Sequence, residues 1–200
     1  APQPGEAVLD ACAGLGGKTG HLAQLMGNRG TLVSADLTAG KLESLAAEMR
    51  RLGVGIVKPL AVDWQSGPGA LGARQFDRVL VDAPCSGLGV IRRHPDAKWN
   101  ADKRQLGDFG RRQSALLLRL ASHVRPGGLL VYAVCSLEPE ETRDVLEAFL
   151  HNCRDWTVDP GADEVPRVVR DRLDAQGCLD TRPLLEVMDG FFAVRLRRPD

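Results

Sequence analysis

The sequence predicts an α/β protein built on a twisted, mostly parallel sheet, with helices on both faces and one antiparallel strand. Two observations predict this fold. Apolar strand patterns alternate with amphipathic helix patterns along most of the chain, and this alternation is typical of a parallel sheet with right-handed crossovers. Near the end of the chain, Phe192, Val194 and Leu196 occupy every second position, which indicates a half-exposed strand that joins the sheet in the antiparallel direction.

The first part of the chain contains three strand patterns separated by two helix patterns. A glycine-rich turn at 13–20 follows the first strand, and Gly27 closes the first helix. Thr38 can cap the second helix, whose apolar face repeats every three or four residues until Gly53. The expected elements are strands at 7–12, 31–35 and 56–62 and helices at 21–26 and 39–52.

The second part of the chain continues the alternation. Pro126 ends a long amphipathic helix before the next strand, and Glu140 and Glu141 suit the positive end of the helix that starts at Pro139. Residues 159–190 show no sustained period, and so long an irregular segment is usually functional or mobile. The expected elements are strands at 76–81, up to Cys135 and at 156–158, a polar loop at 87–100, a helix at 106–124, and a helix after Pro139 that buries Val145, Leu146 and Phe149.

The composition limits the class of protein. The chain has 200 residues, which suits a single domain with a substantial core. Its 26 basic and 26 acidic residues cancel, so net charge gives no sign of a dedicated nucleic-acid binder. The sequence has no long apolar run or signal peptide, and its five irregularly spaced cysteines favour reduced thiols in the cytoplasm. Without a Cys-x-x-Cys pair or a histidine cluster, we expect no metal, no membrane contact and a monomer.

Acidic residues end three consecutive strands, because Asp36, Asp63 and Asp82 follow the second, third and fourth apolar runs. The carboxyl ends of parallel strands meet at one edge of a sheet, beside the glycine turn whose helix start offers free backbone amides. A carboxylate about 20 residues after such a turn can hold ribose hydroxyls. Any one aspartate could instead cap the following helix, but three in succession favour a cofactor of the adenosine type.

The run Gly17-Lys18-Thr19 also looks like the end of a phosphate-binding loop, which would indicate an ATPase or GTPase. That loop requires a glycine five positions before Gly17, where Cys12 stands. Because the phosphate cradle is incomplete, the sequence disfavours a nucleotide hydrolase.

Two cysteines occur where strands end. Cys85 follows the fourth strand and Cys135 ends the fifth, so both sulfurs are expected at the ligand-binding edge. Free cysteines are often buried as small apolar residues, and this interpretation suits Cys12, while Cys153 and Cys178 show no functional pattern. Two thiols at one strand edge favour nucleophilic chemistry over packing.

Four segments together resemble the Sun/RsmB-type RNA (cytosine-5)-methyltransferases, closest to the bacterial 16S ribosomal-RNA enzymes. These segments are 9–19, 81–99, 132–141 and 189–192, and the second is the most specific. The resemblance implies a class I (Rossmann-like) methyltransferase fold, S-adenosyl-L-methionine as cofactor and ribosomal RNA as substrate. We expect residues 1–200 to form one catalytic domain without the RNA-binding segments that the family carries upstream.

The resemblance also implies roles for individual residues. Asp36 would hold the ribose and Asp63 the adenine, and Asp82 would lie between the cofactor and the target base. The turn residues that would hold the methionine end are Cys12, Ala13, Gly14, Leu15, Gly16, Gly17 and Lys18. The departures from the family pattern are Gly14-Leu15 in place of Ala-Pro, Val134 in place of Thr, and Thr142 in place of Asn.

Methylation of cytosine at carbon 5 requires a reactive sulfur, because carbon 5 is a poor nucleophile until a thiolate adds to carbon 6. The resemblance to the RNA enzymes implies Cys135 as this nucleophile, with Cys85 assisting product release. The related DNA enzymes use a Pro-Cys pair after the fourth strand, which would favour Cys85. Asp82 is our candidate acid or hydrogen-bond donor, since a carboxyl beside a flipped base can be protonated by desolvation. The sequence does not identify the general base.

A locally basic stretch follows Cys85, and we expect it to contact RNA. The candidate residues are Arg92, Arg93, His94, Lys98 and Trp99. The cations would contact phosphates, and Trp99 would stack or pack near the base. The alternative is a solvated polar face, and for His94 a loop hydrogen bond is favoured over catalysis.

Two rival functions are considered. An amino-group methyltransferase would carry Asp/Asn-Pro-Pro-aromatic after the fourth strand, where this chain has Asp82-Ala83-Pro84-Cys85, a thiol without an aromatic clamp. A non-catalytic cofactor-binding or RNA-binding module would be favoured by loss of Asp82 or of either strand-end cysteine, and all three are present.

Overall fold

The computed structural model describes residues 1–100, 102–161, 165–182 and 188–200 of the chain. Its strands are β1 (Ala7–Asp10), β2 (Thr31–Asp36), β3 (Val57–Ala61), β4 (Phe76–Asp82), β5 (Val124–Val134), β6 (Thr157–Val158), β7 (Leu179–Asp180) and β8 (Phe192–Arg197). Within the described residues they form one sheet in the order β3-β2-β1-β4-β5-β8-β6, with β7 beside β8.

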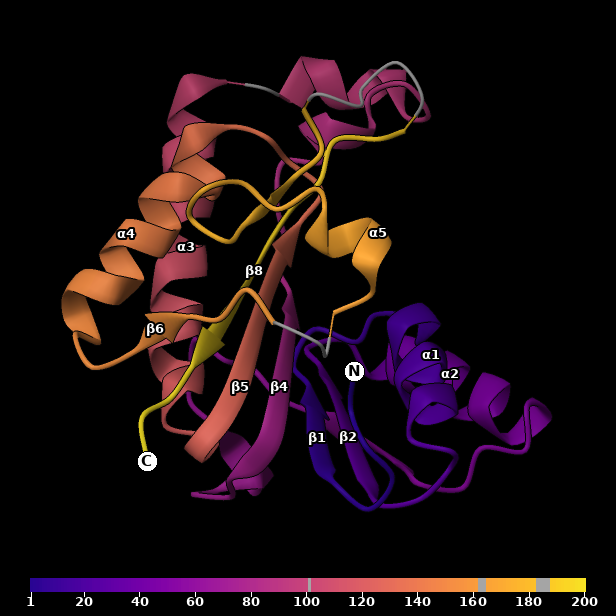
Figure 1. Cartoon of the computed structure of the whole chain (residues 1–200). Coiled ribbons are helices and arrows are strands. Elements are labelled where there is room, and N and C mark those ends of the chain that lie inside the picture. The colour runs from indigo at the N-terminus through magenta and orange to yellow at the C-terminus, as the bar shows by residue number, and fades with distance from the viewer. Residues whose placement is uncertain (101, 162–164, 183–187) are drawn as a thin grey trace.

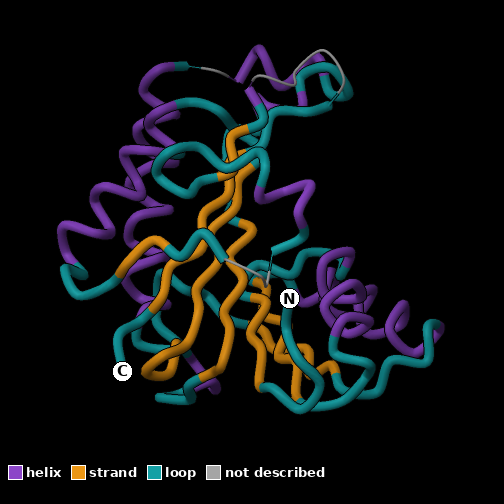
Figure 2. Tube along the Cα trace, viewed as in Figure 1, coloured by secondary structure: helices purple, strands orange, loops and turns teal. Residues whose placement is uncertain are grey.

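Helices lie on both sides of this sheet (Figure 1; Figure 2 colours them purple). The α-helices are α1 (Gly17–Leu25), α2 (Ala39–Arg51), α3 (Lys103–Ala121), α4 (Arg143–Asn152) and α5 (Arg167–Arg170), and the 3-10 helices are η1 (Gly69–Leu71), η2 (Leu88–Val90), η3 (Pro95–Asn100) and η4 (Pro139–Glu141). Helices α1 and α2 lie on one side, and α3 and α4 on the other. None of the described helices is both long enough and apolar enough to span a membrane.

The strand directions confirm the predicted fold class. Strand β1 pairs in parallel with β2 and β4, and β4 pairs in parallel with β5. Strand β8 is antiparallel to β5 over six residue pairs, as its alternating sequence predicted. The connections reverse direction between β1 and β4, and the carboxyl ends on either side of such a reversal form the usual ligand crevice of open α/β sheets.

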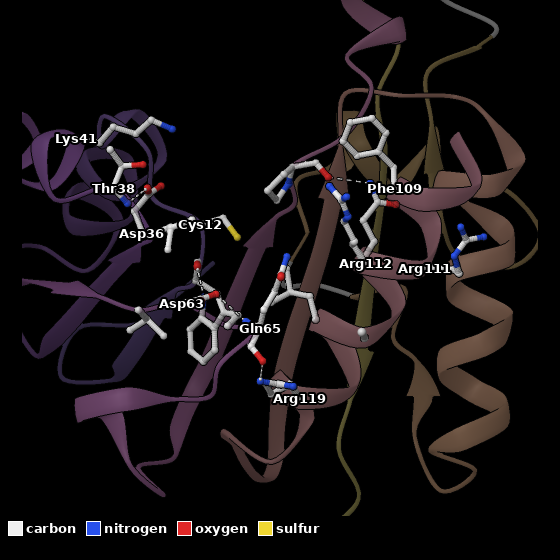
Figure 3. Close-up of a pocket in the computed structure, with 18 residues that line it drawn as sticks. Cys12, Asp36, Thr38, Lys41, Asp63, Gln65, Phe109, Arg111, Arg112 and Arg119 are labelled. Carbon is white, nitrogen blue, oxygen red and sulfur yellow. Dashed lines mark hydrogen bonds between the residues drawn. The ribbon is translucent and has the colours of Figure 1, made fainter. Parts of the chain in front are cut away.

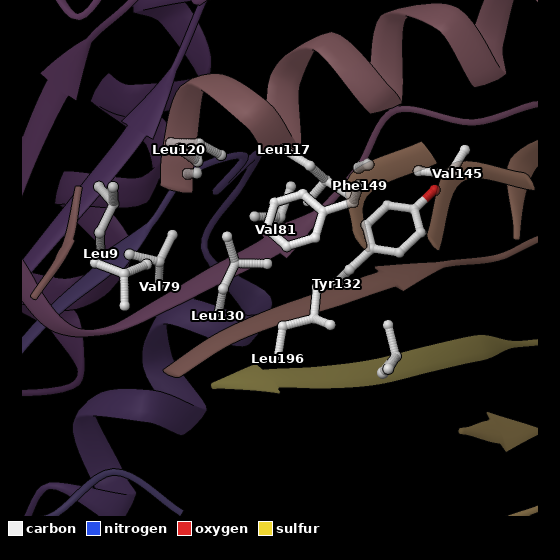
Figure 4. Close-up of a cluster of buried hydrophobic side chains, with 14 of the residues drawn as sticks. Leu9, Val79, Val81, Leu117, Leu120, Leu130, Tyr132, Val145, Phe149 and Leu196 are labelled. Carbon is white, nitrogen blue, oxygen red and sulfur yellow. The ribbon is translucent and has the colours of Figure 1, made fainter. Parts of the chain in front are cut away.

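Alternating side chains of β1 supply the two halves of the core. Leu9 belongs to the large cluster beneath α3 and α4, with Leu117 and Phe149 (Figure 4). Its neighbour Val8 points to the opposite face and packs with Met26 at the end of α1. Burial of each such side chain contributes roughly 1.5–3 kcal/mol. The predicted burial of Val145, Leu146 and Phe149 on α4 is confirmed.

Three local expectations were wrong. Helix α1 begins at Gly17, before the expected His21, because the left-handed backbone of Gly16 (φ 93°) turns the chain directly into the helix. Thr38 makes no side-chain cap on α2, since the carboxylate of Asp36 accepts from its backbone N–H instead. The Pro126–Gly128 segment lies inside β5, where the pairing with β4 shifts register.

The segment 159–190 is irregular over most of its described length, but it contains α5 and β7. Residues 162–164 and 183–187 of this segment lie outside the described residues. On the edge of the sheet beside it, Asp159 accepts hydrogen bonds from Arg195 (3.2 Å) and Arg197 (2.5 Å) of β8. The described part of the segment is therefore attached to the sheet through β8.

Candidate active site

The glycine turn between β1 and α1 is fastened to the end of β2. Asp36 accepts hydrogen bonds from the backbone N–H of Gly14 (3.0 Å) and of Thr38 (2.9 Å) through its two carboxylate oxygens. Gly16 needs to be glycine, because its φ is 93° and an added Cβ would lie 2.8 Å from Cγ of Leu45. Asp36 therefore orders the turn, and each of its oxygens retains a lone pair for a ligand hydroxyl.

Two acidic groups flank the start of α1. Asp10 is fully buried and accepts a hydrogen bond from the hydroxyl of Thr19 (2.7 Å), and burial raises its pKa to about 6. Lys18 Nζ donates to Asp82 Oδ2 at 2.6 Å. Asp82 is therefore an ion-pair acceptor in this structure, whereas the sequence suggested it as a donor to the substrate.

A cavity of about 620 Å³ opens beside the turn, between the ends of β2 and β3 and residues 109–119 of α3 (Figure 3). Asp36 and Lys41 line it from the β2–α2 side, Asp63 and Gln65 from the end of β3, and Phe109 from α3. Its volume is typical of sites for small organic ligands. Cys12 and Asp36, two of the residues predicted to contact the cofactor, line this cavity.

Asp63 has a second role in the loop that it begins. Its carboxylate accepts from the hydroxyl of Ser66 (2.6 Å) and the backbone N–H of Gln65 (2.9 Å). The hydrogen bond from Ser66 is the main cause that lowers the pKa of this exposed carboxyl. Asp63 therefore orders the turn that follows its strand and also borders the cavity, where a ligand could reach it.

The two candidate catalytic cysteines meet at the carboxyl ends of β4 and β5. The Sγ atoms of Cys85 and Cys135 lie 3.1 Å apart. The hydrogen bond with Cys85 lowers the pKa of Cys135 to about 7, whereas the same contact, together with burial, raises the pKa of Cys85. With Cys85 as the donor in this contact, Cys135 is the sulfur that carries the thiolate near neutral pH.

The remaining cysteines differ from this pair. Burial raises the pKa of Cys12 to about 12, with the charges of nearby aspartates acting in the same direction. Burial also raises the pKa of Cys153 and of Cys178. All three are therefore protonated at neutral pH and unsuited to nucleophilic attack.

The predicted RNA-binding residues lie on the segment that follows Cys85, around η2 and η3. All five are exposed: Arg92, Arg93, His94, Lys98 and Trp99. Arg93 Nε lies 2.8 Å and Arg92 NH2 3.6 Å from the buried carboxylate of Asp189. Lys98 Nζ lies 4.7 Å from the ring centre of Trp99, whose side chain is 78% exposed. The two arginines thus have a structural partner, and Trp99 retains an open face.

The family model for 16S rRNA methyltransferases RsmB/F matches residues 1–197. The chain belongs to the RsmB/F family. It is 37% identical over 198 residues to the probable ribosomal RNA small subunit methyltransferase B of Bacillus subtilis, and 36% identical over 198 residues to that of Synechocystis. Each alignment covers 98% of this chain and 44% of the relative, so the chain spans less than half the length of these proteins.

Solved structures extend the comparison. The crystal structure of PH0851 superposes with a TM-score of 0.88 at 33% identity, over 98% of this chain and 43% of that chain. NSun6 from Pyrococcus horikoshii, crystallised with SFG, superposes with a TM-score of 0.81 at 26% identity, over 100% of this chain and 49% of that chain. This RsmB/F chain therefore shares its whole fold with parts of larger proteins.

Several cavity residues of this RsmB/F chain were not predicted. Trp64 lines the cavity and donates through Nε1 to the carbonyl of Ala11 at 2.8 Å, and Arg119 donates to the carbonyl of Gln65 at 2.9 Å. Trp64 directly follows Asp63, so its place after a strand-end aspartate was a usable signal. The periodicity of α3 indicated its buried face but not that Arg119 would reach the cavity.

Proposed function

We propose that this chain transfers a methyl group from S-adenosylmethionine to carbon 5 of a cytosine in ribosomal RNA, through a covalent cysteine–cytosine adduct. The observation that carries the proposal is the pair of sulfurs, Cys85 and Cys135, 3.1 Å apart at the strand edge. Only one of them has a lowered pKa, as a nucleophile and its helper require. The relatives named as ribosomal RNA methyltransferases support the substrate class, which implies action in the cytoplasm.

The cavity and the glycine turn are the proposed cofactor site. SFG, the ligand crystallised with the NSun6 relative, is an analogue of S-adenosylmethionine. The carboxylates of Asp36 and Asp63 suit S-adenosylmethionine, because they can accept hydrogen bonds from its ribose hydroxyls and its adenine amine. The open turn at Gly14 leaves backbone amides near the start of α1. The bound cofactor would supply an electrophilic methyl group. The turn residues assigned to its methionine end are Cys12, Ala13, Gly14, Leu15, Gly16, Gly17 and Lys18.

The proposed reaction begins with Cys135. Its thiolate would add to carbon 6 of the cytosine, and the ring electrons would move toward carbon 5. Carbon 5 would then form the new bond to the methyl group, while the electron pair of the broken sulfur–methyl bond stays on the sulfur of the methyl donor. Asp82, paired with Lys18, is assigned to hydrogen bonding at the edge of the base. A base then removes the carbon 5 proton, the freed pair restores the ring double bond, and the carbon–sulfur pair returns to Cys135. Cys85, beside that sulfur, is assigned to this release step.

Trapping of the protein–RNA adduct tests the proposal. Parent, Cys85→Ala, Cys135→Ala and, as a matched control, Cys153→Ala proteins are incubated with small-subunit ribosomal RNA and S-adenosylmethionine. Each sample is divided between a denaturing gel, an RNA-binding assay and a methyl-transfer assay. We expect the adduct to accumulate in Cys85→Ala, to be absent in Cys135→Ala, and to match the parent in Cys153→Ala.

Two other outcomes would change the assignment. An adduct that accumulates in Cys135→Ala but is absent in Cys85→Ala would show that Cys85, and not Cys135, is the nucleophile. Methyl transfer with RNA binding but without an adduct in any protein would indicate direct methylation of an amino group.

The exposed residues after Cys85 are the proposed contact to RNA. Arg92 and Lys98 present cations to solvent, and the open ring of Trp99 can stack on an unpaired base. Arg93 and His94 belong to the same stretch and are included in the proposed surface. The ion pairs of Arg92 and Arg93 with Asp189 would order this surface before RNA arrives.

A further inference from the structure

Glu141 is a fully buried carboxylate that the proposed chemistry leaves unused. It ends η4, is 0% exposed, and was expected from the sequence only as an acidic residue suited to a helix start. Its Oε1 accepts from the backbone N–H of Ser86 at 2.8 Å, and its Oε2 accepts from the hydroxyl of Ser86 at 2.5 Å. Burying a carboxylate is costly unless such partners satisfy it, so this contact constrains Ser86 strongly.

The same network holds the residue on the other side of Cys85. Gln113 of α3 donates through Nε2 both to the carbonyl of Pro84 at 2.9 Å and to Glu141 Oε1 at 3.1 Å. Cys85 is thus bracketed, because Pro84 is held by the amide and Ser86 by the carboxylate. Its thiol has little freedom to move away from Cys135.

The position of Glu141 is itself fixed by β5 and α3. The hydroxyl of Tyr132 donates to the backbone carbonyl of Glu141 at 2.6 Å and is fully buried. On α3, a Cβ added to Gly110 would lie 2.2 Å from the carbonyl oxygen of Glu140, so η4 seats directly against the helix. The carboxylate of Glu141 is therefore held in one position, unlike the carboxylate of an exposed glutamate.

Glu141 and the proposed nucleophile, Cys135, lie on the same short connection between β5 and α4. Cys135 directly follows β5, and Glu141 closes the 3-10 helix η4 a few residues later. The backbone N–H of Gly89 donates to the carbonyl of Cys135 at 3.0 Å, so the loop that carries Cys85 is tied to this connection at two points. The distance between the two sulfurs depends on both ties.

We propose that Glu141 is a positioning residue for Cys85, which it holds beside Cys135 by fixing Ser86, and that it thereby serves release of the methylated base. This inference rests on the proposed function. It assigns Glu141 no contact with substrate or cofactor.

A positioning role and a merely electrostatic role for Glu141 predict opposite changes in the pKa of Cys135 when Glu141 is neutralised. The hydrogen bond from Cys85 is the main cause that lowers the pKa of Cys135, while the negative charge of Glu141 acts weakly to raise it. Neutralising Glu141 without moving Cys85 would lower the pKa of Cys135. Releasing Cys85 from its place would raise it, because the stronger effect is lost.

The first test measures the rate of iodoacetamide alkylation of Cys135 against pH, in the whole chain and without RNA. We expect the apparent pKa of Cys135 to rise in Glu141→Gln toward its value in Cys85→Ala. Glu140→Gln, the same change at the adjacent position, should match the parent. A fall or no change in Glu141→Gln would overturn the positioning role. Ser86→Ala removes the hydroxyl that donates to Glu141 Oε2 but keeps the backbone N–H bond to Oε1, so it should shift the pKa of Cys135 in the same direction by a smaller amount and serves as the second variant should Glu141→Gln not fold.

The second test separates attack from release. Glu141→Gln should lower turnover about tenfold, as a small displacement of a catalytic group does, and should accumulate the RNA adduct. Adduct formation in a single turnover should keep its parental rate at a pH well above the pKa of Cys135 in both proteins, where the thiolate fraction is the same. Ser86→Ala combined with Glu141→Gln should lose no more than the larger single effect, because both remove one contact. Slower adduct formation without accumulation would contradict the role in release.

The two tests distinguish failure of this inference from failure of the proposed function. If Cys85→Ala does not accumulate an adduct, the assigned release step is wrong, yet the alkylation profile still reports whether Glu141 positions Cys85. If Cys85→Ala accumulates the adduct and Glu141→Gln does not, the proposed function stands and the role of Glu141 is refuted.

Discussion

The turn after β1 and the loop after β4 both shape the candidate site, but they are held in different ways. We call β1–β3 with α1 and α2 the cofactor side, and β4, β5 and β8 with α3 and η4 the cysteine side. On the cofactor side, Asp36 and Asp63 each order the residues that follow them. On the cysteine side, Ser86 depends on Glu141, and Gly89 contacts both Cys135 and Gly190, all distant in sequence.

The difference teaches which parts of the site can be disturbed separately. On the cofactor side, each turn keeps its shape as long as the strand-end aspartate that holds it remains, and Asp36 also holds Gly14 of the neighbouring turn. Geometry on the cysteine side requires several segments at once, so one displaced backbone group there affects both sulfurs. The four predictions below test this separation.

The largest effect is expected from Gly89→Ala on the cysteine side. A Cβ at this position would lie 2.0 Å from the carbonyl oxygen of Gly190 and 2.9 Å from that of Cys135, so a backbone segment must move. A displacement of this size in a catalytic site costs about 100-fold in rate. Methyl transfer should fall by about that factor, while binding of S-adenosylmethionine, measured by calorimetry, stays at the parental value.

Gly55→Ala is the matched control, because nothing lies within 4 Å of its added Cβ. It should leave both measurements unchanged. Equal losses of cofactor affinity and rate in Gly89→Ala would show that the two sides are not separable.

The next largest effect is expected from Asp36→Ala, which changes the cofactor side and should leave the cysteine side unaffected. This change removes the acceptor for the N–H groups of Gly14 and Thr38, as well as the proposed ribose contact. Hydrogen bonds to charged groups contribute about 1.5–3 kcal/mol, so affinity for S-adenosylmethionine should fall about 30-fold. The exposed Glu43 of α2 provides the control, Glu43→Ala. A change in the alkylation profile of Cys135 would contradict the separation.

A smaller effect compares one cysteine from each side. The pKa of Cys135 is lowered to about 7 by the hydrogen bond with Cys85, whereas burial raises the pKa of Cys12 to about 12. The thiolate fraction of Cys135 therefore increases as pH rises through 7, and Cys12 stays protonated. Iodoacetamide at pH 7.5, followed by peptide mass spectrometry, should label Cys135 at least about tenfold faster. Similar labelling rates would refute the difference.

The smallest effect concerns the exposed arginines at the rim of the cysteine side. Arg92→Ala should weaken RNA binding about threefold at moderate salt and reduce the salt slope by about 0.7, as expected for one lost phosphate contact on a single strand. Arg93→Ala should do less than this, because Arg93 is the closer partner of Asp189. Arg50→Ala on α2 is the control. If Arg92→Ala changes neither RNA affinity nor the salt slope, Arg92 does not contact RNA and only pairs with Asp189.

The sequence allowed prediction of the parts that depend on strand ends. Asp36 follows the second apolar run, Asp82 and Cys85 follow the fourth, and Cys135 follows the fifth. Parallel pairing brings such strand ends to one edge of the sheet whatever the loops do. The order of strands and helices was predictable for the same reason, since hydrophobic period and glycine positions are local signals. The antiparallel addition of β8 was predicted from its alternating side chains, whereas its pairing with β5 is known only from the structure.

The remainder depended on contacts that no local signal carries. Glu141 resembles any acidic residue at a helix start, and its burial results from Ser86 and Gln113, which lie far away in sequence. The cavity contact of Trp64 is of the same kind. At Pro126 and Thr38 local propensity pointed the wrong way, because pairing in β5 and the carboxylate of Asp36 outweighed it.

The contact between Gly89 and Gly190 has a consequence for the order in which a new chain matures. The N–H of Gly190 donates to the carbonyl of Gly89 at 2.7 Å, and β8 follows at once. During synthesis the early residues fold first, so the cofactor side can be complete while the final strand is still unmade. The thiol pair then lacks its last support. A growing chain can hold its cofactor before it has a reactive cysteine, and reactivity arrives once Gly190 and β8 have been translated.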